Sequence, residues 1–447
     1  MLAMQQGRTA RRIAGSPRGS VRSLSPPFRV RDAALGVLSL LGLVALPGCQ
    51  LVRPVTHNTL HIVVVPTDKG SMQADPEAHI ELSAPLLDAF RRLHPGVNFR
   101  LKVVQEERIG PELEMHRRRG LGPDLLLVRA PVANALLRRG LVDPVPRDRF
   151  LADTLQAIRP GELQRVRLDG RLAGLPVVEE VTLACYDRRK VSSPPTDLKG
   201  LLALAASGRT IGVSVDPIGI WWSAGSLGAA EPLALLITDH PIPPGHDLER
   251  DRLLVQGWLR WLRQAALQSR VDIASGPDEL LAGLTSGRLA WIPCYSLNLL
   301  RLQQEMGPHL GVASLPSGPE GQASPFSSLR VWTFGTDSSR QQRQLAEELA
   351  RFTLTPKQQR ELTLVSQSVM PVNRFVSIPV AESGRLAAMA TAQNQFRQAT
   401  RGMVAPFSAD RVRRLMPPFE QILFEVMVGV VSPEEGARKL LDLRRIP

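Results

Sequence analysis

Apolar and polar residues follow two different periods along the first part of the chain. Residues 60–66, L-H-I-V-V-V-P, are almost continuously apolar and β-branched, which is typical of a strand buried on both faces. Apolar residues then recur every three or four positions over 82–93, which predicts a helix that ends at the following H-P-G. Two more apolar runs, V-N-F-R-L-K-V-V and P-D-L-L-L-V, flank a helical segment. This alternation predicts a parallel sheet with helices on both faces.

The same pattern returns in the second half of the chain. The segment L-P-V-V-E-E-V-T-L-A-C-Y is long and extended, and T-I-G-V-S-V-D, G-R-L-A-W-I-P and L-G-V-A-S-L-P read as shorter strands. The last hundred residues are helical. Thr355-Pro356 and Ser432-Pro433 each combine an N-cap residue with proline at the first helical position, which predicts two helix starts.

An export signal is indicated at the N-terminus. Seven arginines and one acid precede the uncharged stretch 33–46, which is too short to span a bilayer as a helix. L-P-G-C follows, so the segment resembles a bacterial lipoprotein signal, in which the cysteine receives diacylglycerol. The resemblance implies a signal peptide over 1–48, a lipidated Cys49 and a tether over 49–59. The alternative is an ordinary export signal with an incidental cysteine.

Composition narrows the class of protein. The net charge is +13, and since the leader holds seven cations and one acid, the remainder carries +7 without charged blocks. This excess does not indicate a nucleic-acid binder. About 400 remaining residues predict two domains or one two-lobed body. In an exported protein Cys185 and Cys294 could form a disulfide, but they are equally compatible with two buried thiols.

Sequence motifs of catalysis are missing. The chain has no G-x-S-x-G, no Walker A loop, no H-E-x-x-H and no C-x-x-C. His57 and His61 are four residues apart, but His61 falls in a predicted strand, where that spacing does not build a metal site. We therefore expect no catalytic residues, no metal and no cofactor.

Several segments, in this order, resemble the extracellular solute-binding proteins of ABC importers, the family that includes maltodextrin-binding protein. They are L-L-D-A-F-R-R-L-H-P-G-V, G-P-D-L-L-L-V, R-R-G-L-V-D-P-V, L-P-V-V-E-E-V-T-L-A-C-Y-D-R-R-K-V, S-G-R-L-A-W, V-A-S-L-P-S-G-P-E-G and S-S-L-R-V-W-T-F-G. The resemblance extends from about Leu60 to the end of the chain.

This resemblance implies an α/β, two-lobed periplasmic-binding-protein-like fold of type II. Lobe 1 would comprise 60–182 plus 313–370, and lobe 2 183–312 plus 371–447, joined by crossing hinge strands. It also implies a non-enzymatic monomer that closes on a small solute and delivers it to an ABC permease. The lipid on Cys49 would hold it at the periplasmic face of the cytoplasmic membrane, beside that permease.

Candidate ligand-binding residues lie at strand ends, where open α/β sheets bind ligands. Asp68 and Lys69 follow the first strand and look like the D-K-G of maltodextrin-binding protein, where both charges reach sugar hydroxyls; the alternative is a polar turn. Glu180 corresponds, by its spacing to Tyr186, to a cleft carboxylate of the family. Glu179 is the alternative, because neighbouring side chains of a strand point to opposite faces.

Aromatic candidates follow in lobe 2. Asp216 ends a strand before a proline, as an acidic residue does in the family, and Trp221 and Trp222 come soon after. A tryptophan here could stack on a ligand or pack a helix. Tyr295 lies near the usual position of a stacking tryptophan, although by strict count that position holds Leu297. The late helix offers Met416 and Phe419.

The resemblance favours a sugar or polyol as the solute. Three acids against one lysine would equally suit a polyamine or another cationic solute, and an anion fits this lining least. An exported hydrolase and a structural lipoprotein without a ligand are the competing classes.

Overall fold

In a computed structural model the chain divides into two compact units, Met1–Thr56 and His57–Pro447. The structure describes residues 58–66, 84–146, 149–237, 242, 245–399 and 409–445, all in the second unit. Cys49, Asp68 and Lys69 therefore lie outside the described residues.

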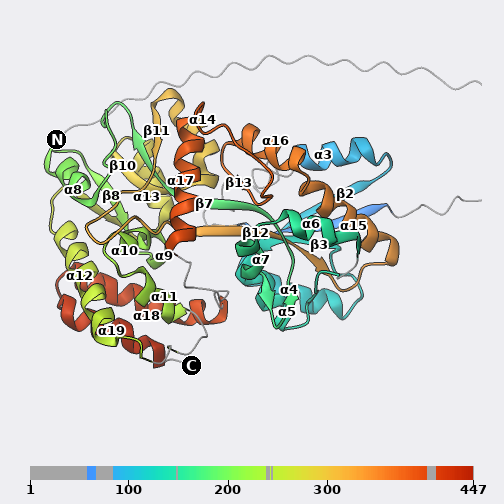
Figure 1. Cartoon of the computed structure of the whole chain (residues 1–447), viewed down its shortest axis with the longest axis horizontal. Coiled ribbons are helices and arrows are strands. Elements are labelled where there is room, and N and C mark those ends of the chain that lie inside the picture. The colour runs from blue at the N-terminus through green and yellow to red at the C-terminus, as the bar shows by residue number, and fades with distance from the viewer. Residues whose placement is uncertain are drawn as a thin grey trace, which may run out of the picture. The chain divides into compact units, whose positions relative to one another are not determined.

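The sheet has eleven strands, and one long strand joins its two halves (Figure 1). The order is β2-β1-β3-β12-β7-β10-β8-β9, with β4 beside β12 and with β11 and β13 beside β7. The strands are β1 (Thr59–Val64), β2 (Asn98–Val103), β3 (Leu125–Arg129), β4 (Val142–Asp143), β7 (Leu175–Asp187), β8 (Ile211–Ser214), β9 (Val271–Ala274), β10 (Trp291–Tyr295), β11 (Leu310–Ala313), β12 (Ser327–Gly335) and β13 (Met370–Pro371). A separate two-stranded sheet contains β5 (Arg167–Leu168) and β6 (Arg171–Leu172).

The first half of the sheet is built as the apolar pattern predicts. β1 pairs in parallel with β2 and β3, and the helices that connect them cover the sheet. Between β1 and β5 the described part of the chain forms five helices: α3 (Ala84–Leu93), α4 (Glu106–Arg117), α5 (Ala130–Arg138), α6 (Arg149–Ala157) and α7 (Pro160–Arg165). β12 enters antiparallel to β3 and to β7 and closes this half.

All 13 residues of β7 are buried. Its first part pairs with β12 and β13, and its later part pairs with β10 and β11. The predicted extended segment is thus one strand that belongs to both halves. Because both of its faces are covered, it reads in the sequence as an apolar run interrupted by two glutamates.

The second half combines β7, β10 and β11 with the parallel pair β8 and β9. Among the helices of this half and of the C-terminal part, α12 packs against α18 and α19. The helices are α8 (Leu198–Ala206), α9 (Pro217–Ile220), α10 (Trp222–Ser226), α11 (Ala230–Ile237), α12 (Leu248–Ala266), α13 (Pro277–Thr285), α14 (Leu299–Met306), α15 (Arg340–Thr353), α16 (Pro356–Ser366), α17 (Gly384–Ala399), α18 (Ala409–Met427) and α19 (Pro433–Asp442), with short 3-10 turns at Ser296–Asn298, Gly307–His309 and Leu443–Arg445.

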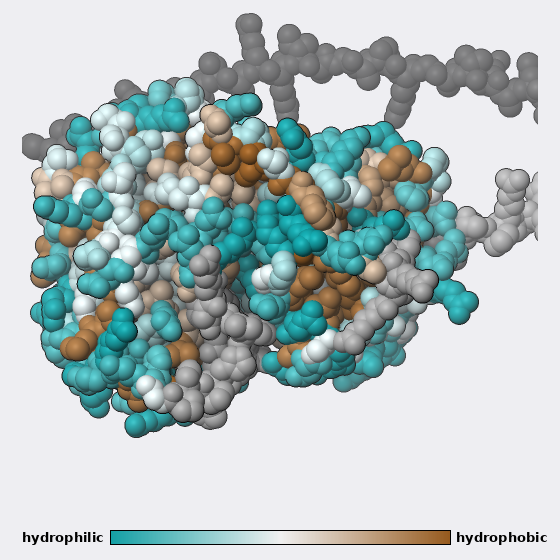
Figure 2. Space-filling model, viewed as in Figure 1, coloured by the Kyte–Doolittle hydropathy of each residue, from teal (hydrophilic) through white to brown (hydrophobic). Residues whose placement is uncertain are grey.

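The surface and the interior differ in polarity, as in other globular proteins. Figure 2 shows that hydrophilic side chains cover most of one face, while apolar side chains reach it in a few places. Three clusters of buried apolar residues form the core. Among the described helices, none has the length and hydropathy of a bilayer-spanning segment.

Both predicted helix starts are present, with different chemistry. Ser432 accepts a hydrogen bond from the backbone N–H of Glu435 at 3.2 Å, as an N-cap should. Thr355 precedes α16 as predicted, but its hydroxyl donates to the carbonyl of Phe352 and caps no N–H of its own helix. Proline alone marks that start.

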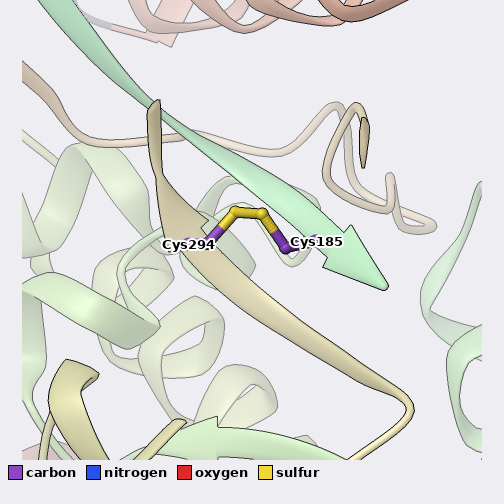
Figure 3. The surroundings of a disulfide bond; sticks show 2 residues. All are labelled: Cys185 and Cys294. Carbon is purple, nitrogen blue, oxygen red and sulfur yellow. A yellow bond between two sulfur atoms is a disulfide. The ribbon is translucent and has the colours of Figure 1, made fainter. Parts of the chain in front are cut away.

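Cys185 and Cys294 form a disulfide, which resolves the alternative left open by the sequence (Figure 3). The bond joins β7 to β10, with the two Cα atoms 5.8 Å apart, and closes a loop across a sequence separation of 109. A crosslink over so long a loop removes conformational entropy from the unfolded chain.

We expect the Cys185→Ala/Cys294→Ala variant to lose about 2–4 kcal/mol of unfolding free energy, because its unfolded chain is no longer crosslinked. Urea denaturation with and without dithiothreitol measures this loss. Reductant should destabilise the wild type to a similar extent and leave the variant unchanged. A variant as stable as the oxidised wild type would contradict the prediction.

Candidate functional site

Two adjacent glutamates, Glu179 and Glu180, stand in the shared strand β7, and both are buried. Consecutive side chains of a strand point to opposite faces, so the two carboxylates enter different surroundings. Each meets arginines from other elements, and the two sets of contacts divide the region into a Glu180 side and a Glu179 side.

On the first side Glu180 faces Arg330 of β12. The Arg330 Nε atom lies 3.9 Å from Glu180 Oε1, and both side chains are nearly inaccessible. Arg330 also donates to the carbonyl of Leu127 at 3.3 Å, and Ser328 stands directly opposite Glu180 in the strand register. An ion pair at this depth keeps both charges compensated.

The polar positions continue along the same face in both directions. In the register Arg330 stands opposite Arg129 on β3, which binds both carboxylate oxygens of Glu106 at 2.8 and 2.5 Å. Thr182, two residues beyond Glu180, stands opposite Tyr295 on β10. We call this strip the Glu180 face; its members are Tyr295, Thr182, Glu180, Ser328, Arg330 and Arg129, together with Glu106, which pairs with Arg129.

Asp216 lies at the carboxyl end of β8, next to this face. It is the N-cap of α9 and accepts the backbone N–H of Gly219 at 2.9 Å. Burial raises the pKa of Asp216, and the backbone hydrogen bonds it accepts oppose that rise. A small pocket here is lined by Ser214, Gly219, Thr182 and Tyr295 among others, so the structure brings the start of α9 to the predicted Tyr295.

Trp221 and Trp222 lie in the hydrophobic core. The Trp222 side chain is fully buried, and its ring packs edge-on against Trp261 and Trp291, with centroids 6.2 and 5.9 Å away. Phe419 of the late helix is also buried, against Trp258. These contacts favour the helix-packing role over ligand stacking for the two tryptophans.

The Glu179 side is a buried network that ties α7 to α17. Glu179 accepts from Arg165 at 3.1 Å and from Gln393, and Arg397 lies 3.5 Å away. Arg397 also binds Glu162 at 2.9 Å. Burial raises the pKa of Glu162, and the nearby charge of Glu179 raises it further. Because Glu179 is held between two helices, Glu180 is the better candidate for a ligand contact.

Sequence reasoning missed Arg330 and Arg129. Arg330 lies within the predicted strand S-S-L-R-V-W-T-F-G, where it interrupts an apolar run, and Arg129 directly follows the predicted strand P-D-L-L-L-V. That interruption is the available signal, since a buried arginine requires an anionic or carbonyl partner. In the described ranges no group of three His, Cys, Asp or Glu side chains is arranged to hold a metal ion.

Comparison with known proteins identifies the fold. The model of a family described as bacterial extracellular solute-binding protein matches residues 86–382. No curated protein matches the sequence. Among solved structures, the GacH receptor of Streptomyces glaucescens is 16% identical, with a TM-score of 0.65 over 86% of this chain and 97% of that chain.

Two further solved structures are similar. The maltose-maltodextrin binding protein of Alicyclobacillus acidocaldarius is 17% identical, with a TM-score of 0.65 over 87% of this chain and 100% of that chain. An ABC transporter solute binding protein of Thermotoga lettingae is 14% identical, with a TM-score of 0.62 over 87% and 99% of the two chains. The expected two-lobed periplasmic-binding-protein fold is thereby confirmed.

We expect Asp216→Asn to change how stability depends on pH. Asparagine is an equally good N-cap, but it cannot ionise. Because the folded pKa of Asp216 is raised, the wild type binds this proton more tightly when folded. The stability that protonated Asp216 contributes to the folded state is therefore full at low pH. It is lost as the pH rises above about 3.9, the unfolded pKa, towards the folded pKa.

Relative to the variant, the wild type should thus lose stability between acidic and neutral pH. Urea denaturation over that range measures the difference. Asp197→Asn, at the exposed N-cap of α8, controls for the cap change itself. A difference between wild type and Asp216→Asn that is the same at every pH would contradict the prediction.

Proposed function

The chain belongs to the bacterial extracellular solute-binding protein family, and from this premise we propose that it captures a neutral sugar or polyol between its lobes and delivers it to an ABC permease. Members of this family are non-enzymatic, extracellular or periplasmic components of ABC transporters. The proposal concerns the class of solute, the residues that bind it and the means of anchoring.

Charge balance on the Glu180 face is the observation that carries the proposal. Glu180 is paired with Arg330, and Glu106 is paired with Arg129. A cationic solute such as a polyamine needs a carboxylate free to pair with it, and these two acids already have cationic partners. The Asp216 carboxylate is likewise engaged, as the N-cap of α9, where it accepts the backbone N–H of Gly219 at 2.9 Å.

Neutral polyhydroxy solutes suit such a lining. Their hydroxyl groups both donate and accept hydrogen bonds, so they use paired carboxylates and guanidinium groups without requiring a net charge. Each hydrogen bond to a charged group contributes about 1.5–3 kcal/mol. Ser328 fits this view, because its buried hydroxyl has no hydrogen-bond partner within the described structure.

Tyr295 is the aromatic residue that we assign to this site, where it can pack on the C–H face of a sugar ring. It is partly exposed and lines the pocket beside α9. We propose that Asp68 and Lys69 complete the lining from lobe 1 as the lobes close. The titles of similar structures name sugars as their ligands, including maltotriose for a Thermus thermophilus protein and α-D-tagatose for the Thermotoga lettingae protein.

We further propose that Cys49 carries a lipid that holds the protein on the outer face of the cytoplasmic membrane. Anchoring raises the effective concentration of the loaded protein at its permease. A monomer suffices for this task, because a two-lobed protein builds the whole site from one chain.

Isothermal titration calorimetry with maltotriose, tagatose, putrescine and spermidine tests the class of solute. We expect saturable heat from a sugar and none from the amines. Glu180→Gln should weaken sugar binding by roughly tenfold or more, because a charged hydrogen-bond acceptor is lost.

Glu179→Gln is the matched control, since it removes the adjacent, equally buried carboxylate from the opposite side of β7. It should lower stability and leave sugar affinity unchanged in the folded protein. Heat from amines alone would overturn the carbohydrate assignment, and product formed from any ligand would overturn the binding role.

The anchor is tested with Cys49→Ala. We expect this change to release the exported protein into the soluble fraction or to leave the precursor uncleaved. Fractionation and immunoblotting measure the distribution, with Cys185→Ala/Cys294→Ala as the cysteine control that stays on the membrane. A cleaved Cys49→Ala protein retained on the membrane as well as the wild type would exclude the lipid tether.

A further inference from the structure

A second cavity, of about 530 Å³, lies apart from the Glu180 face. Its walls come from the end of β7, from α14 and β11, from the end of α16 and from the start of α17 (Figure 1). The volume is within the range of pockets that hold small molecules. None of the residues that line the Glu180 face contributes to it.

Two arginines, Arg188 and Arg385, give this cavity its character. No acidic side chain is among the described lining residues, and neither guanidinium pairs with a carboxylate in the described part of the chain. The only side-chain partner of Arg385 there is the amide oxygen of Gln303, at 2.5 Å. Arg129, Arg165 and Arg330, by contrast, each have an acid beside them.

The two positive charges are close enough to affect each other. Partial burial lowers the pKa of Arg385, and the charge of Arg188 lowers it further. An anion bound between them would relieve both effects, because it replaces lost hydration and offsets the repulsion.

Neutral polar groups complete the lining, where the Ser366 hydroxyl donates to the carbonyl of Leu362 at 2.8 Å and the Ser383 hydroxyl to the amide oxygen of Gln367 at 3.3 Å. Ser366, Gln367 and Ser383 present polar side chains, and Gly384 is the first residue of α17, a helix of 16 residues. Ser383 caps this helix by accepting the backbone N–H of Leu386 at 3.3 Å, and the partial positive charge of a helix start favours an anion nearby. Two cations and a helix start thus converge on one cavity, with no acid among its described lining residues.

We propose that this cavity is a binding site for a small organic polyanion, of the di- or tricarboxylate or phosphorylated class, independent of the transported solute. Two guanidinium groups match a ligand with at least two anionic groups, each bound as a planar fork binds a carboxylate or phosphate. The size of the cavity fits a free metabolite of that class.

Calorimetry on the mature protein tests the site, with citrate and inorganic phosphate as probes. At least one probe should bind saturably, and added sodium chloride should weaken that binding. Arg188→Ala/Arg385→Ala should reduce the affinity by roughly tenfold or more, since charged hydrogen bonds are lost. Arg385→Lys should retain part of it.

Arg360→Ala is the matched control, because it removes one exposed charge from α16 outside the cavity. It should bind the probe as the wild type does. If the double variant does not fold, Arg188→Ala alone tests the site. Its side chain is exposed and makes no hydrogen bond to another described residue, so the substitution should not affect folding.

Three results would overturn the proposal: no saturable heat from either probe, unchanged affinity in the arginine variants, or displacement of the probe by a bound sugar. The failure of sugars to bind would not affect it. If Arg188→Ala/Arg385→Ala loses citrate binding but keeps its affinity for sugar, the two sites are separate.

Discussion

The strand β7 is buried along its whole length and yet carries two adjacent carboxylates. An unpaired charge at such a depth costs several kcal/mol, so each carboxylate requires cations on its own side of the sheet. Arg330 comes from β12 for Glu180, whereas Arg165 and Arg397 come from α7 and α17 for Glu179. β12 and α17 are distant from β7 in sequence, and the need to compensate the two charges helps to bring them to this strand.

The same constraint gives the polar groups on the two sides of β7 different surroundings. On the Glu179 side several donors converge on one carboxylate and lock two helices together. On the Glu180 side the ion pair is longer, at 3.9 Å, and is followed by hydroxyl groups on neighbouring strands. A face of this kind offers donors and acceptors at fixed positions without a net charge, which is the property a neutral solute needs.

The main strands could be predicted from the sequence because strands buried on both faces leave continuous apolar runs. β8 lies within its predicted segment, and β1 and β7 each extend one residue beyond theirs. The pairing of Arg330 with Glu180 could not be predicted from the sequence. The two residues are 150 positions apart, and their contact depends on the register between β7 and β12, which no local pattern specifies.

The tryptophans and cysteines show a second limit. Trp222 follows a strand end, where both a ligand platform and a core residue are chemically reasonable, and only its contacts with Trp261 and Trp291 separate the two. Likewise, Cys185 and Cys294 could be free or bonded until the antiparallel pairing of β7 with β10 brought them within reach. Asp68, Lys69 and Cys49 remain predictions.

The disulfide also has an evolutionary consequence. Cys185 and Cys294 are the only cysteines of the chain besides Cys49. If Cys49 carries a lipid, no third thiol is left to pair with either of them. A lineage that lost one of them would export a protein with a single unpaired thiol, open to oxidation or to crosslinking with a second molecule. We therefore expect the two positions to be gained or lost together among descendants of this gene.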